Sequence, residues 1–210
     1  MLCMTTMVRS KTTLSLLAGG FLALSVGMSA EAAEALRIRG TVESFEGKVL
    51  TVKTREGETA KIALKDGWKI SSVAKASAEA IKPGDFVGIA SAPKSDGGNN
   101  ALEVVIFPAA MKGTGEGSRP WDLQPGSTMT NATVANAVKA VDGPTLTLTY
   151  KGGEKTISIP EGTPIVTFAP AVEADLKSGA TVFVNAEKAE DGSIASSRVV
   201  VGTKGVVPPM

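Results

Sequence analysis

Short runs of alternating apolar and polar residues recur along the chain, separated by turns rich in glycine and proline. In one such run, Leu50 and Val52 alternate with Thr51 and Lys53. Successive side chains of a strand point to opposite faces of its sheet, so this alternation predicts a strand with one buried and one solvated face. We expect ten such strands, at residues 36–45, 49–54, 59–64, 86–90, 102–107, 133–141, 145–150, 154–159, 181–186 and 196–201.

The segment 74–81 is an exception, because it is rich in alanine and lacks the alternation. It predicts a short helix, which Pro83 and Gly84 would end. Three strands, a short helix and two further strands are the order of an OB-fold, a five-stranded Greek-key barrel that leaves no exposed sheet edge. The predicted fold class is therefore all-β with short helices, arranged as two tandem OB-like barrels. A pair of small sandwiches is the alternative.

The two halves of the chain resemble each other at an offset of 96 and then 95 residues. The matching segments are 42–52 with 138–148, 62–64 with 157–159, 79–84 with 174–179, 87–89 with 182–184, and 104–105 with 199–200. Apolar positions and turn glycines agree across the whole unit, so we infer that one small domain has been duplicated.

The N-terminal region has the order of charges and apolar residues that is typical of a signal peptide. Arg9 and Lys11 precede an apolar run over 14–28, and Ala30 and Ala32 then fit positions −3 and −1 of a cleavage site. The run is short for a membrane span, which needs about 20 apolar residues, although an uncleaved anchor is the alternative. We therefore expect a periplasmic protein that is not an integral membrane protein after cleavage.

These observations predict four regions along the chain. They are a signal peptide (1–32), a first OB-like repeat (33–108), a connector rich in glycine and proline (109–130) and a second OB-like repeat (131–210).

The composition of the mature chain excludes several kinds of chemistry. The only cysteine of the sequence, Cys3, lies in the predicted signal peptide, so the mature chain has none. The sequence also has no histidine. Thiol nucleophiles, Ser-His-Asp triads and ordinary zinc sites are therefore excluded. Cleavage would leave 20 basic and 20 acidic side chains, whereas a nucleic-acid-binding protein normally has a basic excess. We expect no catalysis, no cofactor, no bound metal and no nucleic-acid partner.

Three short motifs carry a resemblance to known proteins. They are Arg39-Gly40-Thr41-Val42, Leu50-Thr51-Val52 and Ile81-Lys82-Pro83-Gly84-Asp85. With them the chain resembles a bacterial, exported, OB-like family of unknown function, over residues 37–107 and 133–202. The resemblance implies the β fold and no particular activity. Such proteins are sometimes described as metal-transporter components.

The connector holds the first candidate binding site, made of Arg119, Trp121 and Asp122. A tryptophan offers a stacking face, an arginine a cationic fork and an aspartate an acceptor, which together suit a sugar or an anionic glycan. The alternative is structural: Trp121 fills the space between the two barrels, and Arg119 pairs with Asp122.

The second candidate site is the outward face of the first repeat, because OB-folds commonly bind ligands over their second and third strands. By alternation this face carries Arg37, Arg39, Lys53, Arg55, Lys61 and Lys65, together with Glu43. An ordinary solvated strand face is the alternative.

The function that this sequence predicts is a non-catalytic periplasmic binding or envelope-associated protein. Its expected partner is an envelope glycan, an anionic small molecule or another periplasmic protein. An accessory protein for metal or small-solute handling is one alternative, and a carboxylate-using glycan enzyme is another.

Overall fold

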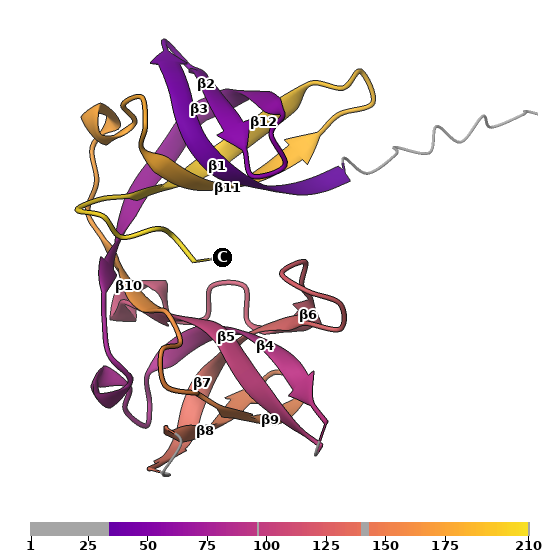
Figure 1. Cartoon of the computed structure of the whole chain (residues 1–210), viewed down its shortest axis with the longest axis vertical. Coiled ribbons are helices and arrows are strands. Elements are labelled where there is room, and N and C mark those ends of the chain that lie inside the picture. The colour runs from indigo at the N-terminus through magenta and orange to yellow at the C-terminus, as the bar shows by residue number, and fades with distance from the viewer. Residues whose placement is uncertain (1–33, 96, 140–142, 210) are drawn as a thin grey trace, which may run out of the picture. The chain divides into compact units, whose positions relative to one another are not determined.

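The computed structural model describes residues 34–95, 97–139 and 143–209 (Figure 1). The predicted signal peptide, residues 1–32, lies outside the described residues. Strands make up 60% of the structure, and within the described residues no helix reaches seven residues. The prediction of an all-β chain is therefore confirmed.

Each of the ten predicted strands overlaps an observed strand, and the pairing adds two shorter ones. The strands are β1 (Glu34–Glu46), β2 (Val49–Thr54), β3 (Thr59–Lys75), β4 (Phe86–Lys94), β5 (Gly98–Phe107), β6 (Gly117–Pro120), β7 (Thr128–Val138), β8 (Thr145–Tyr150), β9 (Gly153–Ser158), β10 (Ile165–Ala169), β11 (Thr181–Lys188) and β12 (Ile194–Gly202). The described helices are single 3₁₀ turns, η1 (Ala78–Ala80), η2 (Ala109–Met111) and η3 (Glu173–Asp175).

Five strands form a closed barrel, and they come from both ends of the chain. β1 pairs with β2 and β11, β2 pairs with β3, and β12 closes the ring by pairing with both β11 and β3. We call these five strands the closed barrel; Figure 1 shows them gathered at the end of the molecule where β1, β2, β3, β11 and β12 are labelled. The first three lie within the first sequence repeat, and the last two lie within the second.

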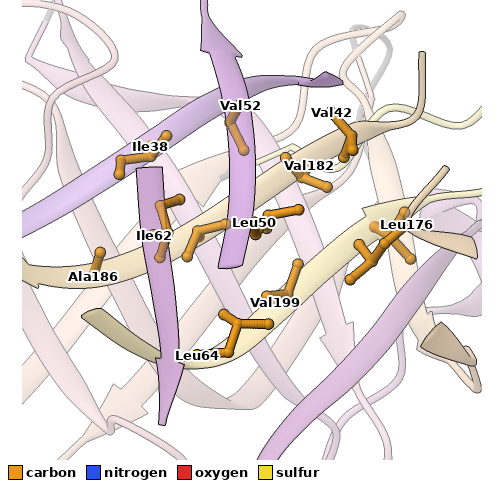
Figure 2. Packing of buried hydrophobic residues seen from close by; sticks show 12 residues of the cluster. Ile38, Val42, Leu50, Val52, Ile62, Leu64, Leu176, Val182, Ala186 and Val199 are labelled. Atoms are coloured by element: carbon orange, nitrogen blue, oxygen red, sulfur yellow. The ribbon is translucent and has the colours of Figure 1, made fainter. Parts of the chain in front are cut away.

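The core of the closed barrel follows from the alternation in the sequence. Leu50, Val52 and Ile62 are fully buried, and Figure 2 shows them directed at one another and at Val199 and Val182 from the facing strands. Burying a side chain of this size contributes about 1.5–3 kcal/mol to folding. The inward faces of strands that are distant in the sequence therefore hold the barrel together.

The remaining long strands form a second strand group, made of β4, β5, β7, β8 and β9. β4 pairs with β5 and β7, and β8 pairs with β7 and β9. β5 and β9 meet through one residue pair, Asn100 with Ser158. Two strands of this group come from the first sequence repeat and three come from the second. In the closed barrel, three strands come from the first repeat and two from the second.

β10 connects the closed barrel to the second strand group. It pairs antiparallel with the end of β3, where Phe168 lies opposite Val73, and parallel with β5. Valines and phenylalanines from both strand groups pack together around this connection in a layer that we call the seam. The seam contains Val73, Val105, Val166, Phe183 and Val200, with Phe107, Trp121, Phe168 and Val206 partly buried against them.

The two halves of the chain have the same strand registers, but the first strand of each half matches the other at a different offset from the one that the sequence alignment gave. Val42 pairs with Val52, and Val134 pairs with Leu148, and each pair is followed by a one-residue shift of register. Val134, and not Val138 as aligned from the sequence, is therefore the counterpart of Val42. The alignment matched the turn glycines, but the connection from β7 to β8 is four residues longer than that from β1 to β2.

The predicted helix at 74–81 is wrong for most of its length. β3 continues to Lys75, and a single turn, η1, follows it. Alanine is compatible with a helix, but residues 69–75 pair with β12 and β10, and this pairing extends the strand.

Each strand group combines strands of both sequence repeats, an arrangement that we call the strand exchange. It predicts how the protein behaves when its connector is cut. We expect a protease site inserted after the exposed Lys112, once cleaved, to leave the two fragments bound together. The ladders between β1 and β11, β3 and β12, and β4 and β7 all join one fragment to the other. Gel filtration of the cleaved protein, with and without urea, measures this. Two folded fragments that elute separately without urea would contradict the strand exchange.

Candidate functional site

The connector loop that follows β6 is held in one conformation by its own hydrogen bonds. The backbone N–H of Trp121 donates to the carbonyl oxygen of Ser127 at 2.8 Å. The buried Ser127 hydroxyl lies 2.9 Å from the carbonyl oxygen of Trp121 and 2.7 Å from that of Gln124. The loop therefore presents Trp121 and Asp122 in fixed positions.

Asp122 and Trp121 meet two arginines of β1. Arg39 donates two hydrogen bonds to the Asp122 carboxylate, at 2.8 and 3.1 Å, and Arg37 lies 3.6 Å from the same group. The Arg37 guanidinium also lies over the Trp121 ring, 4.1 Å from its centre. Arg37 and Arg39 share this face because they flank Ile38, whose side chain points into the barrel core. Residues from the two predicted sites are thus joined in one cluster.

Arg119, the third residue predicted in the connector, does not pair with Asp122. Its guanidinium donates to the carbonyl oxygen of Gly115 at 2.9 Å. Partial burial, together with the nearby charge of Arg37, lowers the pKa of Arg119. The predicted pairing of Arg119 with Asp122 is therefore wrong, because the arginines of β1 bind the Asp122 carboxylate instead.

Glu103 of β5 faces the same cluster, and sequence analysis missed it. Glu103 is 5% exposed, and it lies on the same face of β5 as the seam residues Val105 and Phe107. Within the described residues neither its Oε1 nor the Trp121 indole nitrogen has a hydrogen bond of ordinary geometry. A single carboxyl group inside the apolar run of residues 101–107 was the available signal, since unpaired carboxyl groups are rarely buried.

Burial and charge act on the two carboxyl groups of the cluster in opposite directions. Burial raises the pKa of Glu103 to about 7, although the charges of Arg39 and Arg55 and the Trp121 indole lower it. Partial burial also raises the pKa of Asp122, but the hydrogen bonds and charge of Arg39 outweigh this and hold the pKa below its ordinary value. Near neutral pH, the cluster therefore contains one ionised carboxylate and one carboxyl group that is close to its titration midpoint.

The other predicted residues of the first-repeat face do not join the cluster. Lys53 and Lys61 are exposed on β2 and β3, where they lie opposite Thr59 and Thr51. Within the described residues neither of them makes an ion pair. Arg55 is also exposed and acts on Glu103 only through its charge.

A separate feature lies at one end of the second strand group, where the described residues line a cavity of about 840 Å³. We call it the mouth cavity. Its apolar lining includes Ala76, Ile81, Ala137, Ile159 and Ile165. Glu79, Lys82, Lys139 and Glu161 also line it, so charges of both signs surround the cavity.

The corresponding end of the closed barrel is filled by two aromatic rings. Phe45 and Trp68 pack edge to face, with ring centres 5.8 Å apart, and both lie against the barrel core. We call this pair the aromatic plug. Phe45 lies opposite the buried Leu50, as Ala137 lies opposite the buried Leu146.

The second ring of the aromatic plug also has a small counterpart. Trp68 lies two residues before Ile70, which pairs with Val199. Thr163 lies two residues before Ile165, which pairs with Val104. Ile165 and Val104 are each 95 positions from Ile70 and Val199, so Thr163 is the counterpart of Trp68. Alanine and threonine therefore stand in the mouth cavity where phenylalanine and tryptophan stand in the closed barrel.

Compared with known proteins, the chain matches no family model, and no curated protein or solved structure matches it significantly. The resemblance to exported OB-like proteins therefore stays a prediction. Within the described residues there is no helix that is long and apolar enough to cross a membrane. In the same part of the chain, no three histidine, cysteine or acidic residues are placed to hold a metal ion.

The packing of Trp121 predicts a structural effect of its removal. We expect Trp121→Ala to lower the free energy of unfolding by about 2–4 kcal/mol, because a partly buried ring that contacts the seam would be lost. Urea unfolding measures this, and in a Trp68→Phe background the fluorescence of Trp121 can be followed alone. Strong acrylamide quenching of Trp121, with unchanged unfolding of the alanine variant, would contradict its position in the seam.

The raised pKa of Glu103 predicts how stability depends on pH. A carboxyl group whose pKa is higher in the folded state stabilises the fold at low pH, and this contribution is lost as pH rises from about 4.5 to 7. We expect Glu103→Gln to remove that loss and to be more stable than the unmodified protein at pH 8 by up to about 3 kcal/mol. Urea unfolding at pH 5 and pH 8 measures the difference.

The exposed Glu58→Gln is the matched control for this experiment, and it should leave the pH dependence unchanged. If Glu103→Gln instead destabilises the protein equally at both pH values, Glu103 does not carry the pH dependence.

Proposed function

We propose that this chain is an exported, non-catalytic binding protein made of two OB-like modules, and that it binds a small molecule with an apolar body in the mouth cavity. The observation that carries the proposal is the difference between two corresponding ends. The aromatic plug covers the end of the closed barrel, whereas the described residues at the same end of the second strand group leave a cavity.

The recurrence of the strand registers supports two modules of common origin. Ile70 of the first half pairs in parallel with Val199 of the second half, and Ile165 of the second half pairs in parallel with Val104 of the first half. Corresponding residues of the two pairs are 95 positions apart. In this proposal the modules arose by duplication and share their last two strands with each other. Export rests on the signal-peptide pattern of residues 1–32 and implies a periplasmic location.

The size and lining of the mouth cavity support its role in binding. Pockets for small molecules commonly measure about 300–1,000 Å³ and combine apolar walls with a few polar groups. Ile81, Ile159 and Ile165 are nearly fully buried and provide an apolar wall, and the charges of the lining residues are balanced. A neutral ligand with an apolar body and a polar part suits this site better than a strongly charged one.

The cluster that Arg37 and Arg39 form with Trp121 and Asp122 is less suited to be the glycan or anion site that the sequence suggested. Arg37 covers the Trp121 ring, which would be the stacking face for a sugar. Both oxygens of Asp122 accept hydrogen bonds from Arg39, which would be the fork for an anion. These groups satisfy one another, and we propose that they position the strand groups rather than bind a ligand.

Transplanting the aromatic plug tests the proposed binding site. The probe is N-phenyl-1-naphthylamine, a neutral dye whose fluorescence rises in apolar surroundings. We expect it to bind the unmodified protein saturably, and the double variant Ala137→Phe, Thr163→Trp to reduce its affinity at least tenfold, because the two rings fill the cavity.

The matched control is Ala135→Phe, which adds the same ring to an exposed position of β7 outside the cavity lining. It should leave dye binding unchanged. Equal dye binding by the plugged double variant and the unmodified protein would show that the mouth cavity is not the binding site.

A further inference from the structure

The aromatic plug of the closed barrel shows which chemistry fits this end of the fold. Phe45 and Trp68 meet at an interplanar angle of 71°. Like Ala171, they pack against the barrel core, which includes Leu176, and Ala171 and Leu176 flank η3. Aromatic pairs prefer this edge-to-face arrangement. The protein therefore fills one of its two corresponding ends with flat rings.

The mouth cavity retains the same surroundings without the rings. Ala76 and Ile81 flank η1 as Ala171 and Leu176 flank η3, and they line the cavity. At two of the differing positions, the smaller Ala137 and Thr163 stand where the closed barrel has the aromatic rings of Phe45 and Trp68. The space that they leave has the position of a phenyl and an indole ring.

The walls of the mouth cavity oppose its collapse. Pro83, Pro144 and Pro160 line it, and each proline fixes its own backbone φ angle. Thr163 ties the turn at its rim, because its hydroxyl donates to the carbonyl oxygen of Pro160 at 2.7 Å. Lys82 and Lys139 also line the cavity and can place cationic groups near a bound ring.

We propose that the ligand of the mouth cavity is a small molecule carrying a neutral aromatic ring system, of the size of an indole, which occupies the positions of the absent rings. This inference rests on the proposed binding function of the same cavity and names the class of its ligand. One face of the ring packs against the aliphatic wall, the other face lies toward the lysines of the rim, and the polar part of the ligand lies at the charged rim.

Competition against N-phenyl-1-naphthylamine tests the class of ligand. The competitors are indole and cyclohexanol, which are both neutral and small, but only one of them has a flat aromatic ring. We expect indole to displace the dye at a concentration about threefold or more lower than cyclohexanol, as the contact between ring and cation adds to apolar burial. The double variant Ala137→Phe, Thr163→Trp should bind neither competitor, as judged by backbone amide shifts near Ile159 and Ile165.

The outcomes separate this inference from the proposed function. Displacement of the dye by both competitors at equal concentration would overturn the aromatic class while the cavity remained a binding site. Displacement by the tripeptide Gly-Trp-Gly but not by indole would indicate an aromatic side chain of a partner protein and would also overturn it. Dye binding that the transplanted plug leaves unchanged would overturn the proposed function itself.

Discussion

The ladder between β1 and β11 is the interaction on which the other features of this structure depend. It pairs Ile38 with Val184, residues more than 140 positions apart, and it leaves β12 to close the ring against β3. Without these two C-terminal strands, β1, β2 and β3 form an open meander with two unpaired edges, which proteins generally avoid. The same ladder directs Arg37 and Arg39 away from the barrel core and toward the connector loop.

Charged groups lie beside the apolar seam, in the cluster around Arg39 and Asp122. Arg39 is the central group: its side chain is 10% exposed, it holds Asp122 by two hydrogen bonds, and its charge acts on Glu103. Burying charges is costly unless they are paired and hydrogen-bonded. The cluster meets this cost by keeping the half-exposed Asp122 ionised and by making the buried Glu103 easy to protonate. A small change in pH near neutrality therefore changes the charge of Glu103 in this cluster.

The sequence predicted the local structure well and the partners of the strands poorly. Alternation such as that of Leu50 and Val52 identifies a strand and its buried face, because both depend on neighbouring residues. Whether β3 pairs with β12 or with a strand of its own repeat depends on contacts that a local pattern does not encode. The candidate site divided in the same way, since Trp121 and Asp122 stood out as residue types, while their contacts with Arg37 and Arg39 depend on the strand exchange. The mouth cavity was not predicted, because the alignment paired Phe45 with residue 141 and so concealed its counterpart, Ala137.

The strand exchange also governs the order in which this chain can fold during its synthesis. β1 ends at Glu46, and β12, which closes the ring, ends at Gly202, so the ribosome must add 156 further residues before the barrel can close. At about 5–20 residues per second this interval is on the order of ten seconds, during which an edge of β1 has no partner in the chain. Charged residues on an edge strand discourage pairing with other molecules. Arg37 and Arg39, which hold Asp122 in the finished protein, are thus also charges of the kind that discourages such pairing while the nascent strand waits for the end of its own chain.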